Sequence, residues 1–223
     1  PRSTLFPYTT LFRSLVWGVF ALLSYQTYST AFGNPAACGA FPVNVANETD
    51  LNEAIDCFNT KTLPETYTIN FTADVNLSAS TSIIQNSIEG ISLNMVGNEF
   101  SIDGQNTEGV RPLTIYTDTT VLIQDLTITR GNVKRIPDVP LEFSSGGGIS
   151  NFGSLTLNNT NVISNVVQDW GGGIFSADVS SLTIRNSVIQ GNIAQDDGGG
   201  IQSFGELEID ETTIANNSAT NFS

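Results

Sequence analysis

A four-residue motif, Gly-Gly-Gly-Ile, occurs three times in the chain and constrains its fold more than any other feature. Its copies begin at Gly146, Gly171 and Gly198, so they are 25 and 27 residues apart. Regular spacing in this range is typical of repeats that stack on one another. Glycine suits the start of each repeat because it allows a positive φ and a close approach of successive turns.

The glycine triplets have an alternative interpretation as phosphate-binding loops. Such loops continue with Lys and then Ser or Thr, and no triplet here is followed by that pair. We therefore interpret all nine glycines as structural. They are Gly146, Gly147, Gly148, Gly171, Gly172, Gly173, Gly198, Gly199 and Gly200.

Each repeat also contains short stretches in which apolar and polar residues alternate, such as Leu155-Thr-Leu157. Alternation of this kind predicts half-buried strands, about three in each repeat. If each repeat forms one turn, equivalent apolar residues stack in inward columns about 4.8 Å apart. The expected columns are Ile149/Ile174/Ile201, Leu155/Leu182/Leu207 and Leu157/Ile184/Ile209. The sequence therefore predicts an all-β fold, a parallel β-helix over residues 61–223.

An asparagine recurs near the end of each repeat, at Asn165, Asn192 and Asn217. Stacked asparagines form amide ladders in other layered sheets, which is the interpretation we favour here. A binding groove lined by the three amides is the alternative. The chain ends 6 residues after Asn217, where the next glycine triplet is due, so we expect the natural coil to continue.

A short helix is predicted before the repeats. Asp50-Leu-Asn-Glu53 has the pattern of a capping box, and Leu51, Ala54, Ile55 and Phe58 lie on one helical face. One apolar face placed before a long β region suits a lid on its hydrophobic end. We expect residues 34–60 to form this cap, with Leu51, Ile55 and Phe58 packed over Ile69 and Phe71.

The first 33 residues carry signs of processing. Residues 4–14 resemble the in-frame translation of a sequencing-library adapter, so we exclude residues 1–14 from the analysis of the fold. The apolar run Leu15–Leu23 is too short to span a bilayer, and small residues near Ala31 and Gly33 suit cleavage. Residues 15–33 are therefore predicted to be a signal peptide, with a buried strand as the alternative.

The two cysteines of the chain, Cys38 and Cys57, fit an exported protein as a disulfide pair. The bridge would close a loop of about 20 residues and contribute about 3 kcal/mol. The alternative for Cys38 is a lipid attachment site, which would leave Cys57 unpaired.

The charge of the chain excludes several functions. It has 8 basic and 22 acidic residues, no histidine and a net charge of −14. Such a chain repels phosphate backbones and cannot use Ser-His-Asp or histidine–metal chemistry. We expect no nucleic-acid partner, no cofactor and no transmembrane helix. Asp196 and Asp197 are candidates for calcium binding. They are weak candidates, because their sequence spacing is not that of known calcium loops.

Two further features suggest binding surfaces. The segment Gly131–Ser145 interrupts the coil and contains Lys134 and Arg135, which we consider a possible binding loop. A tolerated insertion is the alternative. Thr127, Thr156 and Thr183 could also form an outward column of the kind that binds ice or crystals, although ordinary strand propensity explains them equally well.

Together these motifs resemble the repeats of polymorphic outer membrane proteins, which are bacterial surface proteins. Their Gly-Gly-Ala-Ile/Leu and Phe-x-x-Asn motifs are present here with Gly for Ala and an aliphatic residue for Phe. The resemblance covers about residues 45–223. It implies a right-handed parallel β-helix of the pectin-lyase-like fold and an exported protein of adhesive role.

The predicted function is that of a secreted, outer-membrane or cell-surface adhesin, passenger or stalk, with glycans or host surfaces as partners and no catalytic residues. The alternative is a polysaccharide-active lyase or glycoside hydrolase of the same fold. Neither the Gly-His-Gly nor the Arg-Ile-Lys motif of the polygalacturonases is found in this chain.

Overall fold

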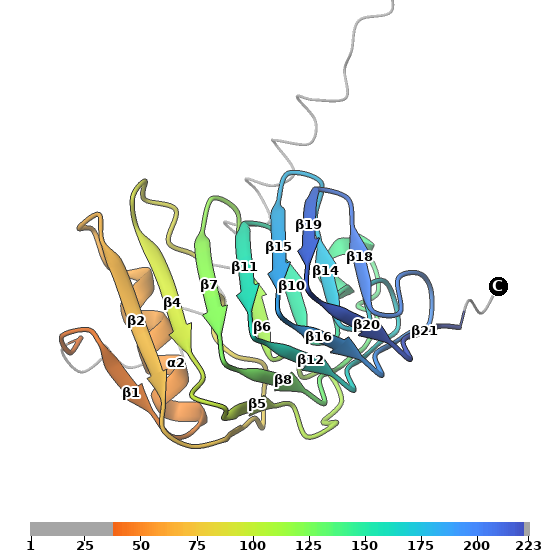
Figure 1. The fold of residues 1–223 in the computed structure, drawn as a ribbon, viewed down its shortest axis with the longest axis horizontal. Helices are drawn as coiled ribbons and strands as arrows, with labels where there is room; N and C mark the ends of the chain where they lie inside the picture. Colours follow the sequence, from red (N-terminus) through yellow and green to blue (C-terminus); the bar gives the residue numbers. More distant parts are fainter. Residues whose placement is uncertain (1–37, 221–223) are drawn as a thin grey trace, which may run out of the picture. The chain divides into compact units, whose positions relative to one another are not determined.

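The computed structural model describes residues 38–220, and in this range the chain is a parallel β-solenoid with one short α-helix (Figure 1). This architecture confirms the predicted all-β fold. Four segments lie outside the described residues: the adapter-like segment (1–14), the predicted signal peptide (15–33), the first residues of the predicted cap (34–37) and residues 221–223.

The strands form four parallel sheets, A to D. Each complete turn of the solenoid adds one strand to each of the four sheets. Sheet A contains β1 (Val43–Val45), β2 (Thr66–Phe71), β4 (Ser92–Val96), β7 (Thr120–Gln124), β11 (Ser154–Asn158), β15 (Ser181–Arg185) and β19 (Glu206–Asp210). Sheet B contains β3 (Val75–Asn76), β5 (Ser101–Asp103), β8 (Thr127–Thr129), β12 (Asn161–Ile163), β16 (Val188–Gln190) and β20 (Thr213–Ala215). Sheet C contains β6 (Leu113–Ile115), β10 (Ile149–Asn151), β14 (Ile174–Ser176) and β18 (Ile201–Ser203). Sheet D contains β9 (Asn132–Val133), β13 (Val166–Val167), β17 (Ile193–Ala194) and β21 (Ser218–Ala219).

The register of the strands is the one that the repeats predict. In sheet C, Ile149 pairs with Ile174 and Ile174 with Ile201. In sheet A, the same holds for the column Leu155/Leu182/Leu207 and for the column Leu157/Ile184/Ile209. The residues of these columns up to Ile184 belong to one continuous hydrophobic cluster, and Ile201 packs against that cluster. Burial of each aliphatic side chain contributes about 1.5 to 3 kcal/mol, so the columns hold the turns together.

The prediction of three strands in each turn was wrong, because complete turns contain four. The additional strands belong to sheet D and are only two residues long, as in β13. Val167 is buried in a small cluster of its own, with Val133 and Ala194. A two-residue strand is too short to show alternation, so sequence patterns cannot reveal it.

The helix α2 (Glu48–Asn59) begins earlier than the predicted capping box. Its N-cap is Asn47, whose Oδ1 accepts a hydrogen bond of 3.0 Å from the backbone N–H of Asp50. The Asp50 carboxylate in turn accepts hydrogen bonds from the backbone N–H of Ala46 and from the Asn47 side chain. Asp50 is therefore the third residue of the helix, where a carboxylate reaches back to the chain before the first turn.

The apolar face of α2 covers the N-terminal end of the core. Leu51, Ile55 and Phe58 are fully buried and share one cluster with Ile69 and Phe71. Figure 1 shows the helix lying against the first turns, beside β1 and β2. Cys57 on the same helix forms a disulfide with Cys38, and the two Cα atoms are 5.4 Å apart.

A carboxylate at the first residue of α2 links the cap to the coil. Glu48 accepts hydrogen bonds from the backbone N–H and the hydroxyl of Ser78 and from the backbone N–H of Ala79, at 2.7 to 3.1 Å. Partial burial raises the pKa of Glu48, but these hydrogen bonds outweigh it and hold the pKa below its ordinary value of 4.5. The ionised carboxylate therefore stabilises the folded state.

This link makes the stability of the cap depend on pH. Because the folded pKa of Glu48 is lowered, its contribution is complete above pH 4.5 and is lost as the pH falls through the folded pKa. We expect Glu48→Gln to lower the free energy of unfolding at pH 7 and to have a progressively smaller effect as the pH falls from 4.5 toward 2. Urea unfolding over this pH range measures this. Glu53→Gln, at an exposed position of the same helix, is the control, and an equal loss for both variants would contradict the prediction.

Candidate functional site

Each glycine of the first triplet is required for a different reason. Gly146 has a φ of +83°, in the left-handed region that favours glycine. A Cβ on Gly147 would lie 2.8 Å from the carbonyl oxygen of Val166, and one on Gly148 would lie 2.9 Å from the side-chain nitrogen of Asn165. The triplet therefore lets successive turns approach closely at the corner where the asparagine side chains lie.

The three recurrent asparagines form a hydrogen-bonded ladder along this corner. The side-chain nitrogen of Asn165 donates to Asn192 Oδ1, and that of Asn192 donates to Asn217 Oδ1, both at 3.0 Å. The same oxygens accept backbone N–H groups from Asn165 and Asn192. Asn165 and Asn192 are fully buried, so these amides hold the turns together and leave no open groove between them.

The predicted binding loop lies against sheet C. Residues 132–133 belong to β9, so the insertion is shorter than the sequence suggested and comprises residues 134–145, which we call the insertion loop. It contains one 3₁₀ turn, η1 (Leu141–Ser144). Phe143 stacks on Phe152 with ring centroids 5.8 Å apart. Ser150, on the outer face of sheet C, is fully buried.

Both cations of the insertion loop form ion pairs with residues of neighbouring turns. Lys134 forms an ion pair with Glu108. The Nε of Arg135 is 3.1 Å from Oδ1 of the buried Asp169, whose other carboxylate oxygen accepts a hydrogen bond from Ser144. These pairs tie the loop to neighbouring turns, while the Lys134 and Arg135 side chains stay 49% and 55% exposed, so the binding role of this loop stays a prediction.

Arg111 holds the end of the insertion loop from the preceding turn. Its guanidinium donates hydrogen bonds of 2.9 Å to the carbonyl oxygens of Phe143 and Gly146. Burial lowers the pKa of Arg111 to about 10, so the group remains charged at neutral pH. Charged donors form the stronger hydrogen bonds, which makes Arg111 the main anchor of this loop.

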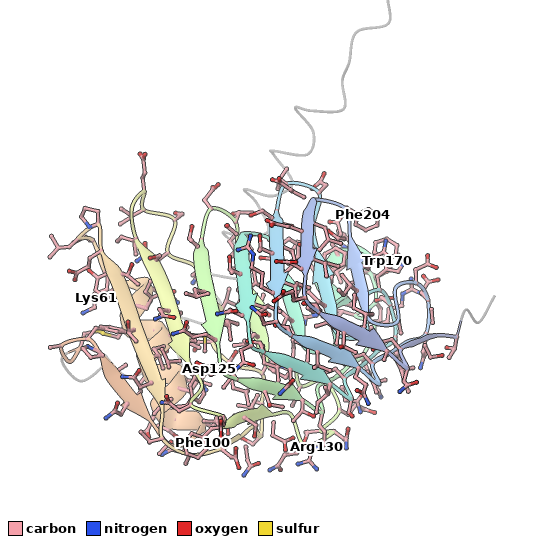
Figure 2. The ribbon with its side chains drawn as sticks, in the orientation of Figure 1. Lys61, Phe100, Asp125, Arg130, Trp170 and Phe204 are labelled. Carbon is pink, nitrogen blue, oxygen red and sulfur yellow. A yellow bond between two sulfur atoms is a disulfide. The ribbon has the colours of Figure 1, made fainter. Side chains whose placement is uncertain are left out.

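A row of aromatic rings runs along the outer side of sheet C, and sequence analysis did not identify it. Phe152, Phe175 and Phe204 follow one another with centroids 5.9 and 6.1 Å apart. The ring centroids of Trp170 and Phe204 are 5.5 Å apart. Figure 2 shows these two labelled side chains beside β18. The Phe-Gly dipeptides that begin at Phe152 and Phe204 were the available sequence signal for this row. Phe175 lies at a different position of its repeat, so the row has no regular spacing in the sequence.

The weak calcium candidates do not form a ligand cluster. Asp196 accepts a hydrogen bond of 3.1 Å from the indole nitrogen of Trp170, and Asp197 is exposed. Within residues 38–220, no group of three or more Cys, Asp or Glu side chains is arranged to hold a metal ion. Asp196 therefore has a structural contact with Trp170, and its role as a calcium ligand stays a prediction.

The expected threonine column is not formed. Thr156 and Thr183 do pair in sheet A, but the residue before them in that column is Leu122. Thr127 lies in sheet B, where it pairs with Asn161. The predicted column was wrong because it placed Thr127, which belongs to sheet B, in one column with Thr156 and Thr183, which belong to sheet A.

The other basic residues beyond residue 14 also have intramolecular partners. Arg130 Nε donates to Asp103 Oδ1 at 2.8 Å, and Arg185 pairs with Glu208 at 2.7 Å. The ammonium group of Lys61 lies 5.1 and 5.7 Å from the ring centroids of Phe41 and Tyr67. With every cation of residues 38–220 engaged and an excess of carboxylates, the surface of this part of the chain repels anionic partners.

Comparisons with protein-family models, with curated proteins and with solved structures found no match to this chain. No helix among residues 38–220 is long and apolar enough to cross a membrane. The candidate functional features therefore rest on the geometry of the chain itself.

The asparagine ladder makes a prediction about stability. Asn192→Ala removes both ladder contacts and leaves buried N–H groups without acceptors, so we expect the free energy of unfolding to fall by about 3 kcal/mol. Asn161→Ala, at an exposed position with one hydrogen bond of 3.3 Å, should change it by about 0.5 kcal/mol or less. Chemical denaturation of both variants measures the difference. Similar losses would show that the ladder contributes no more than a surface amide.

The anchoring of the insertion loop makes a second prediction. Arg111→Met keeps much of the side-chain volume but removes the hydrogen bonds to Phe143 and Gly146. We expect hydrogen exchange of residues 134–145 to become about tenfold faster, because the loop opens more often. Arg185→Met breaks only an exposed ion pair and should leave this exchange unchanged. If Arg111→Met also leaves the exchange rate unchanged, Arg111 does not anchor the loop.

Proposed function

We propose that this chain is exported and acts as a rigid, non-catalytic β-helix at the bacterial cell surface, as an adhesin, passenger or structural stalk. The observation that carries the proposal is the use of carboxylates as links between turns. Asp103 binds Arg130, Asp169 binds Arg135 and Ser144, and Asp74 accepts hydrogen bonds from Ser101. Carboxylates held in this way position the backbone and are not presented to a substrate.

The cysteine bridge supports the proposed export. Disulfides persist in oxidising compartments, and Cys38–Cys57 joins the start of the described chain to the cap helix. The leader-like composition of residues 15–33 agrees with this compartment. The proposed relation to the polymorphic outer membrane protein repeats, within the pectin-lyase-like fold, is supported by the roles of the glycine triplets and of the asparagines.

The alternative is a polysaccharide-active lyase or glycoside hydrolase. A glycoside hydrolase needs two carboxyl groups about 5 to 9.5 Å apart in one groove. Acidic side chains that already bind neighbouring turns do not suit that role. The two functions differ in one measurable property, because an adhesin binds without converting its ligand.

A binding assay combined with a turnover assay tests the proposal. The exported full chain, fluorescently labelled, is added to bacterial and epithelial cells and to immobilised polysaccharides. We expect saturable binding that is lost when the chain is reduced and unfolded, with no new reducing ends or unsaturated uronates in the supernatant. Release of either product would establish the enzyme alternative, and absence of binding to every surface would contradict the adhesive role.

A further inference from the structure

The turns that connect sheet C to sheet A alternate in length. Residues 116–119, between β6 and β7, and residues 177–180, between β14 and β15, form turns of four residues. Residues 152–153 and 204–205 form turns of two residues in the intervening repeats. Figure 1 shows the connections at β7 and β15 rising above the one at β11. Two long turns therefore flank a short one and leave a hollow between them.

Glycine makes the short turn possible. A Cβ on Gly153 would lie 2.6 Å from the carbonyl oxygen of Tyr116, and one on Gly205 would lie 2.5 Å from that of Ala177. Each short turn thus lies directly against the backbone of the long turn before it. Gly153 forms the base of the hollow, and a larger residue there would push the long turn away.

The hollow is a cleft of about 310 Å³ that opens to solvent. Thr117 and Asp118 line one wall, and Val179 and Ser180 line the other. This volume is at the lower limit of ordinary small-molecule sites. The cleft is therefore large enough for one or two rings of a small ligand.

The floor of the cleft continues into a row of hydroxyl groups on sheet A. Thr120, Ser154 and Ser181 occupy equivalent positions on three successive strands and all line the cleft. Ser181 Oγ is 2.9 Å from Ser154 Oγ in a hydrogen bond. Because Ser181 donates its hydroxyl hydrogen to Ser154, the hydroxyls of Ser154 and Thr120 remain as donors to a ligand, and all three oxygens can accept hydrogen bonds.

The carboxylates of the cleft are too far apart for metal binding or for paired acid–base catalysis. Asp118 lies in the turn before β7, and Glu206 begins β19, three strand positions further along sheet A, so their backbones are separated by about 14 Å along the sheet at a strand spacing of about 4.8 Å. Calcium requires ligands at about 2.3 to 2.6 Å, and glycoside hydrolysis requires carboxyl groups about 5 to 9.5 Å apart. Their remaining use is to accept hydrogen bonds from a ligand at each end.

We propose that this cleft binds an uncharged oligosaccharide, an inference that rests on the proposed surface function and names its ligand class. The row of hydroxyls matches the hydroxyl groups of a sugar, and the carboxylates accept hydrogen bonds from them. Val179, which is 77% exposed, offers an apolar contact on one wall. The net charge of −14 disfavours acidic sugars.

The test compares two exposed threonines in one column of sheet A. Thr66 aligns with Ser92, and Ser92 aligns with Thr120, but only Thr120 lines the cleft. The full chain is titrated calorimetrically with maltotriose, cellotriose, laminaritriose, mannotriose and xylotriose. Trigalacturonate and the trimer of glucosamine serve as the anionic and cationic probes. Thermal unfolding of each variant confirms that it is folded.

We expect at least one uncharged trisaccharide to bind saturably. Thr120→Trp fills the cleft and should weaken this binding by about tenfold or more, whereas Thr66→Trp should leave it unchanged. Thr120→Val, which keeps the size but removes the hydroxyl, should weaken binding by about fivefold. The valine variant provides the readout if the tryptophan variant fails to fold.

Three outcomes would overturn the inference: no uncharged trisaccharide binds, only a charged probe binds, or Thr120→Trp binds as tightly as Thr66→Trp. The cell-binding assay, repeated with the same variants, separates this inference from the proposed function. Cell binding that persists in Thr120→Trp would reject the cleft as the site and leave the adhesive function standing. Conversion of a trisaccharide would reject the non-catalytic function itself.

Discussion

The turns of the solenoid are held together by stacking of equivalent aliphatic residues in parallel register. Leu155 lies between Val121 and Leu182, and Leu157 lies in the same way between Ile123 and Ile184. A shift of one residue would turn these side chains outward, because neighbouring residues of a strand face opposite sides. Sheets, corners and cap all depend on this register.

The polar interactions maintain the register but contribute less of the stability. Exposed ion pairs such as Arg185–Glu208 contribute between about 0 and 1 kcal/mol each. The buried asparagine ladder matters more, because breaking it leaves amide groups without partners in the interior. A slipped turn would lose both the aliphatic stacking and the ladder, so the two constraints reinforce each other.

Departures from the repeat are the places where this scaffold differs from a plain rod. The insertion loop covers the outer face of sheet C and is bound by Arg111 and Asp169. The alternation of long and short turns makes the cleft above Gly153. Rigid scaffolds commonly carry recognition on such irregular connections, since a loop can vary without disturbing the core.

The sequence by itself determined the features that repeat: the inward columns, the glycine triplets, the position of the asparagines, the cysteine pair and the apolar face of the helix. Each is encoded by spacing, and spacing is visible in a single chain. Only the tertiary structure decided the features without a period, namely the two-residue strands of sheet D, the partners of Lys134 and Arg135, the aromatic row and the cleft. These depend on which side chains meet between turns that are about 25 to 35 residues apart, and local patterns carry no record of such contacts.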